Sequence, residues 1–206
     1  MDKIDCVLLG AGSSKRMEED KLLLTVGDST IFEISLAEYL RSSLHSTCAV
    51  VAGWLRGFKP IMGRYRDSSV SFIEVQRPCP MSDSLKSGWR WVQDNLRPRA
   101  VMVSLADKPL ISSRTIDSLI RAYSSSDKDI CVPVFAGKRG HPVIICSRLD
   151  DEIMSIEGDR GARDLLARDP DRVQEVAVGT DEILVDIDTL DDMGRLQSRL
   201  GYNERS

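Results

Sequence analysis

The sequence lacks the features that mark nucleic-acid-binding, membrane and secreted proteins. It has no excess of basic residues, because 28 lysines and arginines stand against 32 aspartates and glutamates and give a formal net charge of −4. No broad positive field is therefore available to collect nucleic acid by counterion release. No apolar run approaches membrane-spanning length, and acidic residues interrupt the first run, unlike in a secretory signal. We expect a cytoplasmic protein without nucleic-acid or membrane partners.

Cysteine and histidine are sparse, and their placement does not suggest a disulfide framework or a zinc site. The five cysteines are widely spaced, and no two form a Cys-x-x-Cys pair. Because most of them fall within strand-like runs, we interpret them as reduced thiols of the core. The only histidines are His45 and His141. The 206 residues can bury a full core, and without a repeat or a low-complexity linker we expect one domain over residues 1–206.

The sequence does contain a regular alternation of strand and helix patterns. Short runs rich in Val and Ile predict strands at 4–9, 47–52, 70–75, 100–105 and 130–134. Apolar residues at helical spacing lie between these runs, over 31–40, 85–96 and 116–123. Later segments predict strands at 142–146, near 173–178 and at 183–186, a helix after Gly158 and a closing helix from Thr189. This order is typical of an α/β fold, a Rossmann-like three-layer sandwich around a mostly parallel sheet.

The strongest chemical signal is a loop of small residues after the first predicted strand. The strand leads into Gly10-Ala11-Gly12-Ser13-Ser14, and Lys15, Arg16 and Lys21 follow. Glycine lets the backbone approach a ligand closely, and successive amides in such a turn favour an anion. The spacing matches neither a dinucleotide fingerprint, whose third glycine would fall at Lys15, nor a Walker-type loop. We predict a nucleotide-phosphate loop completed by cations; the alternative is a tight turn with solvated basic side chains.

A lone carboxylate, Asp107, follows the fourth predicted strand. In parallel sheets ligands bind beyond the carboxyl ends of the strands, so Asp107 is well placed to hold a divalent cation. The alternative is that it caps the helix that begins near Ser112.

A second acidic element, Asp186-Ile187-Asp188-Thr189, closes the last predicted strand. Asp186 and Asp188 share one face by strand alternation, so one of them could join Asp107 around a metal ion. The alternative is a helix start, in which Thr189 and Asp192 form a capping box and the acidic residues gain from the helix dipole.

Five blocks of the sequence together resemble the MobA-like nucleotidyltransferases. They are Leu9-Gly10-Ala11-Gly12-Ser13-Ser14-Lys15-Arg16-Met17 with Lys21, Ala106-Asp107-Lys108-Pro109, Gly140-His141-Pro142-Val143, Gly158-Asp159-Arg160-Gly161-Ala162-Arg163 and Asp186-Ile187-Asp188-Thr189-Leu190-Asp191-Asp192. The third and fourth blocks are most similar to the molybdenum cofactor cytidylyltransferase branch. The resemblance implies a fold of the nucleotide-diphospho-sugar transferase type. Lys108 departs from the pattern, because glutamine is common at that position.

The resemblance also implies roles for residues at the nucleotide end of the site. The loop residues that would bind the triphosphate are Leu9, Gly10, Ala11, Gly12 and Ser13. Arg16 and Lys21 would contact phosphate oxygens as catalytic cations, and Asp107 would bind Mg²⁺, for which Mn²⁺ could substitute. A second metal ligand would come from Asp186 or its neighbour Asp188. The implied reaction transfers CMP from CTP to the phosphate of molybdopterin and releases pyrophosphate, and a molybdenum hydroxylase would be the client of the product.

Further residues are candidates for contacts with the base and the acceptor. The resemblance matches Ser84 to a serine that contacts the base; the alternative is a residue of the helix start. His141, between Gly140 and Pro142, is predicted to line the acceptor-substrate side of the site. The alternative is a purely structural role in a turn. Asp159, Arg160 and Arg163 are candidates for binding the pterin phosphate. The alternative is a helix that begins at Gly158, with arginines that point outward.

Other classes of function remain as rivals. A Rossmann oxidoreductase would need an acidic residue at the end of its second strand to bind a ribose, and 49–53 ends without one. A non-catalytic protein that delivers the cofactor would be expected to lack Arg16, Lys21 or Asp107, and all three are present. Within the nucleotidyltransferases, a guanylyltransferase of the same cofactor and an enzyme that acts on a sugar phosphate are the alternatives.

Overall fold

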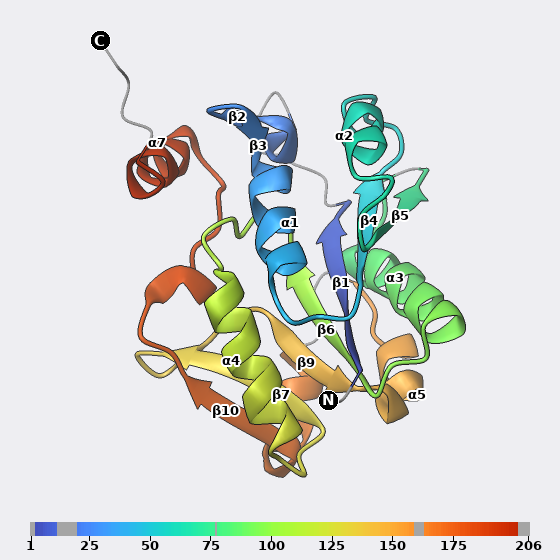
Figure 1. Ribbon diagram of the computed structural model, residues 1–206. Coiled ribbons are helices and arrows are strands. Elements are labelled where there is room, and N and C mark those ends of the chain that lie inside the picture. Colours follow the sequence, from blue (N-terminus) through green and yellow to red (C-terminus); the bar gives the residue numbers. More distant parts are fainter. Residues whose placement is uncertain (1–2, 12–19, 77, 159–162, 202–206) are drawn as a thin grey trace.

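The computed structural model describes residues 3–11, 20–76, 78–158 and 163–201 (Figure 1). Its centre is a sheet with the strand order β10-β7-β9-β6-β1-β4-β5. The strands are β1 (Ile4–Gly10), β4 (Thr47–Ala52), β5 (Val70–Val75), β6 (Ala100–Leu105), β7 (Ile130–Phe135), β9 (Val143–Cys146) and β10 (Val173–Ala177). The pairs β6–β1, β1–β4, β4–β5 and β7–β10 are parallel, whereas β9 runs antiparallel to both β6 and β7. The mostly parallel sheet is as predicted.

The helices form two layers, one on each face of the sheet. The longer ones are α1 (Ile31–Arg41), α2 (Phe58–Arg64), α3 (Met81–Asn95), α4 (Ser113–Ser124) and α7 (Leu190–Arg199), and the shorter ones are α5 (Asp150–Met154) and α6 (Arg163–Arg168). Buried residues of α1, α2, α4 and α7 pack in one apolar cluster, and those of α3, α5 and α6 in another. In Figure 1 α1 and α4 cross in front of the sheet, with α3 behind it. The architecture is the predicted three-layer sandwich.

Strand β1 shows how the sequence pattern produces this core. All seven of its residues are buried, because helices cover both faces of the sheet. Successive side chains point to opposite faces, so that Cys6 and Leu8 join the cluster with α1 and α4, while Val7 and Leu9 join the cluster with α3. The five cysteines are free thiols, and Cys6, Cys48 and Cys131 are buried, in agreement with the expectation of reduced core residues.

Several elements differ from the sequence prediction. The strand predicted at 183–186 is wrong: the chain forms a short 3-10 turn, η4 (Asp181–Ile183), and then a segment without regular secondary structure, outside the sheet. There the backbone N–H of Ile187 donates to the carbonyl of Asp107 at 3.1 Å instead of to a neighbouring strand. Helices α2 and α5, the hairpin of β2 (Thr25–Val26) and β3 (Ser29–Thr30), and β8 (Lys138–Arg139) beside β7 were not predicted. Among the described helices none has the length and apolarity needed to cross a bilayer.

Helix α1 is anchored at its start by a charged contact that reaches α2. Thr30 and Glu33 form a capping box, in which each side chain accepts a hydrogen bond from the other residue's backbone N–H. Arg64 of α2 donates from Nε and Nη2 to Oε1 of Glu33, at 3.0 and 2.6 Å. Burial alone would raise the pKa of Glu33, but the hydrogen bonds from Arg64 and Thr30 outweigh it and lower the pKa below its ordinary value. The charged form of Glu33 therefore stabilises the fold.

We expect Glu33→Ala to lower the free energy of unfolding by about 2 kcal/mol, since it removes the Glu33 side-chain half of the capping box and leaves Arg64 without this partner. Because the folded pKa of Glu33 is depressed, its contribution is present above the unfolded pKa of about 4.3 and is lost as the pH falls through the folded value. Urea denaturation at pH 7 and at stepwise lower pH measures both effects. Thr30→Ser, which keeps the capping hydroxyl, should unfold like the wild type. Equal stability of Glu33→Ala and wild type at pH 7 would contradict the prediction.

Candidate active site

The first part of the site is the turn that follows β6. Ala106 continues the pairing of β6 with β1, because its backbone N–H donates to the carbonyl of Leu9 at 2.9 Å. The Oγ of Ser35, on α1, donates to the carbonyl of Ala106 at 2.7 Å. These two bonds fix the backbone just before Asp107. The carboxylate of Asp107 is thus presented at the carboxyl ends of β1 and β6, where ligands bind in parallel sheets.

Lys21 brings a cation to the same edge of the sheet. It begins the short 3-10 helix η1 (Lys21–Leu23), whose N-cap is Asp20: the backbone N–H of Leu22 donates to Oδ1 of Asp20 at 3.0 Å. The Lys21 ammonium donates to Oδ2 of Asp107 at 2.8 Å and to Oδ1 of Asp188 at 2.7 Å. Three residues far apart in the sequence therefore meet at one nitrogen atom.

The protonation of Lys21 follows from these contacts. Burial disfavours the charged ammonium, but the charge of Asp107 and the hydrogen bonds to Asp107 and Asp188 outweigh it, so the pKa of Lys21 is raised. Lys21 is therefore a fixed positive charge at physiological pH. A phosphate oxygen brought to this place would meet a cation that is already oriented by two carboxylates.

The second oxygen of Asp107 is suited to a further ligand. Oδ1 is buried, and among the described residues it has no hydrogen-bond partner. A buried carboxylate oxygen without a partner is costly unless a cation or a donor completes it. Asp107 and Asp188 both face the Lys21 ammonium. Carboxylate oxygens are the ligands that Mg²⁺ and Mn²⁺ prefer. Asp107 and Asp188 thus fit a divalent cation.

The three carboxylates predicted as metal ligands are shared between two lysines. Asp107 and Asp188 contact Lys21, whereas Asp186 forms an ion pair with Lys108. Within the described part of the chain no cluster of three or more His, Cys, Asp or Glu side chains is arranged as a metal site. A metal role for these residues stays a prediction, and the contact to Lys21 favours Asp188 over Asp186 as the partner of Asp107.

The segment from 185 to 188 connects this site to the last helix. Ile187 is buried and hydrogen-bonds the carbonyl of Asp107, while Asp186 and Asp188, on either side of it, are more exposed. Thr189 and Asp192 form the predicted capping box of α7. The capping interpretation of Asp107 is wrong, because the N-cap of α4 is Ser112, whose Oγ accepts from the N–H of Thr115.

Part of the predicted nucleotide loop can be placed. Gly10 is the last residue of β1, and a Cβ there would lie 3.2 Å from the Phe32 ring and 3.3 Å from the carbonyl of Val50, so the position suits a residue without a side chain. Leu9 and Ala11 beside it are buried. Gly12, Ser13 and Arg16 lie outside the described residues.

Ser84 and Gly158 lie near the start of α3. Ser84 is buried in the first turn of α3, with its Oγ 3.4 Å from Sγ of Cys79, and the N-cap of this helix is Pro80. The N–H of Ser82 donates to the carbonyl of Gly158 at 3.1 Å, which joins the two segments. Arg163 begins α6, in agreement with the predicted helix, but its side chain, Asp159 and Arg160 lie outside what the structure describes.

His141 belongs to a different set of contacts. It is half-buried in the turn between β8 and β9, precedes a cis peptide bond to Pro142, and donates its backbone N–H to the carbonyl of Ile183 at 3.2 Å. The preceding Gly140 is packed so tightly on Ile183 that a Cβ would lie 2.5 Å from the same carbonyl oxygen. The turn is therefore fixed against η4, and a role of His141 toward an acceptor stays a prediction.

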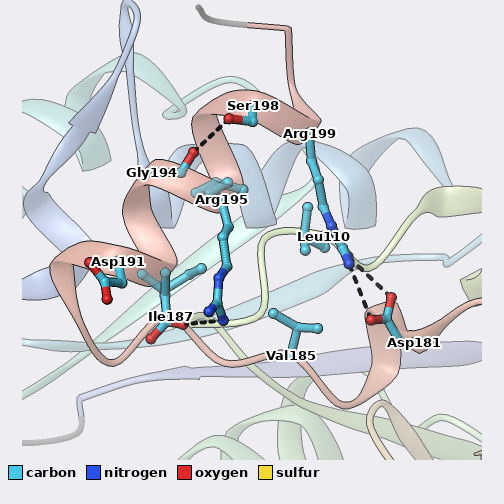
Figure 2. Close-up of a pocket in the computed structure, with 11 residues that line it drawn as sticks. Leu110, Asp181, Val185, Ile187, Asp191, Gly194, Arg195, Ser198 and Arg199 are labelled. Atoms are coloured by element: carbon cyan, nitrogen blue, oxygen red, sulfur yellow. Dashed lines mark hydrogen bonds and ion pairs between the residues drawn. The ribbon is translucent and has the colours of Figure 1, made fainter.

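A surface pocket of about 670 Å³, which no sequence pattern indicates, lies between α7 and the 181–187 segment. Figure 2 shows Arg195 and Arg199 extending from α7 toward this segment. Arg199 binds both carboxylate oxygens of Asp181 at 3.1 Å, and Arg195 lies 3.7 Å from Asp192. Ile187 lines the pocket and also bonds the backbone of Asp107, so the pocket adjoins the back of the lysine–aspartate site.

Comparisons with known proteins agree with this geometry. The model of the MobA-like NTP transferase domain family matches residues 6–174. Over 195 residues the chain is 27% identical to the molybdenum cofactor cytidylyltransferase of Escherichia coli K12, with 93% of this chain and 94% of that protein covered.

Solved structures share the fold over nearly the whole chain. The manganese complex of Rv0371c from Mycobacterium tuberculosis H37Rv has a TM-score of 0.77 and 23% identity, covering 95% of this chain and 98% of that one. A nucleotidyl transferase from Methanothermobacter thermautotrophicus has a TM-score of 0.78 and 19% identity, covering 98% and 99%. The fold is thus that of the nucleotide-diphospho-sugar transferases, as expected from the sequence.

Proposed function

The chain belongs to the MobA-like NTP transferase family, and from that premise we propose that this nucleotidyltransferase moves CMP from CTP to the phosphate of molybdopterin or the molybdenum cofactor. The observation that carries the proposal is the Lys21 ammonium held between Asp107 and Asp188 at the carboxyl ends of β1 and β6. The similarity to a molybdenum cofactor cytidylyltransferase supports the choice of donor and acceptor.

The proposed reaction is an in-line substitution at the α-phosphorus of the nucleotide. An oxygen of the acceptor phosphate forms the new bond to this phosphorus, and the bond to the bridging oxygen breaks, so that pyrophosphate leaves with the electron pair. Donor and acceptor are both anions, and charge repulsion and positioning therefore dominate the barrier. No protein nucleophile is needed.

The described residues have defined tasks in this reaction. Lys21, already oriented and charged, binds phosphate oxygens and offsets the repulsion between the reactants. Asp107 and Asp188 would hold Mg²⁺, with Mn²⁺ as a substitute, and such an ion supplies charge neutralisation at the phosphates. The manganese complex of Rv0371c supports a divalent cation in a protein of this fold. The Leu9–Ala11 backbone lies at the end of β1, where the loop toward the triphosphate begins.

The proposal is tested by pyrophosphate release in the presence of Mg²⁺. CTP, GTP, ATP and UTP are each combined with molybdopterin-type cofactor and with a panel of sugar phosphates. We expect release with CTP and the pterin, and little with other pairs. A preference for GTP would replace the proposed donor, and release only with a sugar phosphate would replace the acceptor. No release from any pair, with nucleotide still bound, would overturn the catalytic proposal in favour of a delivery role.

A further inference from the structure

Lys108 is a buried cation in the turn beside the proposed cation site. Its side chain is only 5% exposed, whereas that of its partner Asp186 is 44% exposed. The turn itself is fixed, because the N–H of Lys108 donates to the carbonyl of Leu105 and the N–H of Ile111 donates to the carbonyl of Lys108. Burying an ammonium is unfavourable, and replacing such an ion pair by apolar residues is often neutral or stabilising. Stability alone therefore does not explain a lysine at this place.

The partner of Lys108 lies on the segment that carries Asp188. This segment belongs to no strand of the sheet, so no strand pairing sets its position. Within the described residues its contacts alternate: Asp186 meets Lys108, Ile187 is buried and bonds the backbone of Asp107, and Asp188 meets Lys21. The buried Ile187 therefore anchors the backbone between two aspartates that each contact a lysine. Fixing Asp186 thus also fixes the direction of Asp188.

The same geometry sets the register of the segment. A shift by one residue would expose Ile187, which is 1% exposed, and would turn both aspartates away from the two lysines. Lys21 cannot set this register alone, because it contacts Asp107 as well, and a shift by two residues would bring Asp186 to the place of Asp188. Lys108 comes from the fixed turn after β6 and pairs with Asp186. This second ion pair allows only one register of the 185–188 segment.

We propose that Lys108 is a positioning residue: through its ion pair with Asp186 it holds the 185–188 segment so that Asp188 completes the cation site with Asp107. This inference rests on the proposed function, in that the site must take a divalent cation. It assigns Asp186 to Lys108 rather than to the metal ion. It also gives the buried lysine a task that involves no contact with nucleotide or acceptor.

The test compares Mn²⁺ binding by wild type and Lys108→Met, which keeps the length of the side chain but removes the charge. Electron paramagnetic resonance titration without nucleotide gives the dissociation constant for Mn²⁺, and we expect it to rise about 10-fold, as for other partners that orient metal ligands. In steady-state assays the KM for the cation should rise similarly, while kcat at saturating cation stays within about twofold. Thermal melting should show a stably folded variant.

Two further variants separate positioning from a general structural effect. Asp186→Asn should weaken Mn²⁺ binding by a similar factor, and the double variant with Lys108→Met should be no weaker than either single variant, because both remove the same contact. Arg64→Met, which breaks the ion pair with Glu33 elsewhere in the fold, should lower stability and leave Mn²⁺ binding unchanged.

The outcomes distinguish this inference from the proposed function. If the wild type binds Mn²⁺ and both Lys108→Met and Asp186→Asn bind it equally well, the positioning role is wrong and the cation site stands. If Lys108→Met does not fold, Asp186→Asn and Lys108→Gln replace it, and the same rise in the dissociation constant for Mn²⁺ is expected of both. If the wild type does not bind Mn²⁺ with or without nucleotide, the cation site itself is wrong, and the role of Lys108 falls with it.

Discussion

Replacing Asp107 with asparagine is expected to lower kcat/KM for nucleotidyl transfer about 1,000-fold, a loss of roughly 4 kcal/mol of transition-state stabilisation. Asparagine keeps the shape of the side chain but removes the charge that contacts Lys21 at 2.8 Å. It also replaces the buried Oδ1, which has no hydrogen-bond partner among the described residues, by an atom that is a weaker ligand for a cation or none. Initial rates of pyrophosphate release over a range of cation concentrations measure the effect.

The control for this variant is Asp94→Asn, which makes the same chemical change at an exposed position near the end of α3. It should have wild-type kinetics. Asp107→Asn should melt within a few degrees of the wild type, because the backbone contacts of the turn, from Ala106 to Leu9 and from Ile187 to Asp107, do not use the side chain. Activity within tenfold of the wild type at saturating cation and nucleotide would show that Asp107 is not at the reacting centre.

The centre of the sheet could be predicted from the sequence because β1, β4 and β6 are buried on both faces. The strands β4, β5 and β6 have the predicted bounds. β4 and β6 are mostly apolar runs, whereas β5 contains Ser71 and Glu74 and is only partly buried. The segment at 183–186 is also apolar up to Asp186, yet it contains the end of a 3-10 turn and residues without regular secondary structure. The difference lies in the backbone hydrogen bonds of this segment: the N–H of Ile187 donates to the carbonyl of Asp107 and not to a neighbouring strand. The local pattern of apolar residues does not indicate which hydrogen-bond partner the backbone will have.

The composition of the candidate site could be predicted, but its pairing could not. Asp107 and Lys21 were expected at the same edge of the sheet, and the structure brings them together. The expected alternation around Ile187 agrees with the burial, because Ile187 is buried whereas Asp186 is exposed and Asp188 is half-buried. Which lysine each aspartate contacts depends on side chains more than 70 residues away in sequence, as the Lys21–Asp188 pair shows with a separation of 167.

Burial of Lys108 is the part of the site that no sequence pattern indicated. In the sequence it is a lysine in a polar turn, and such residues are ordinarily exposed. In the structure it is buried in the turn after β6, where its ammonium pairs with Asp186 and the carbonyl of the preceding Asp107 accepts from the N–H of Ile187. The pocket beside α7 was missed for the same reason, since its lining residues come from a helix and a segment whose packing is a tertiary property.

Replacing Lys21 with methionine is expected to slow turnover at least about 100-fold at saturating nucleotide, a loss near 3 kcal/mol. Methionine retains an unbranched apolar side chain and removes only the charged group that would lie among the phosphates. The raised pKa of Lys21 means that the wild type carries this charge throughout the neutral pH range. Single-turnover measurements of CMP transfer separate the chemical step from product release. Lys59→Met, at an exposed position on α2, provides the matched control.

The two site variants should differ in how they respond to the divalent cation, although both remove one side of the same contact. Asp107→Asn deletes a ligand, so its Mn²⁺ affinity should fall together with its rate. Lys21→Met instead leaves Asp107 and Asp188 facing each other without the ammonium that separates their charges, which favours a cation between them. Its Mn²⁺ affinity should therefore be equal to that of the wild type or higher, while its rate is low. A Lys21→Met variant with near-normal turnover, or one that loses Mn²⁺ binding, would show that this lysine holds the carboxylates in place and does not act on the phosphates.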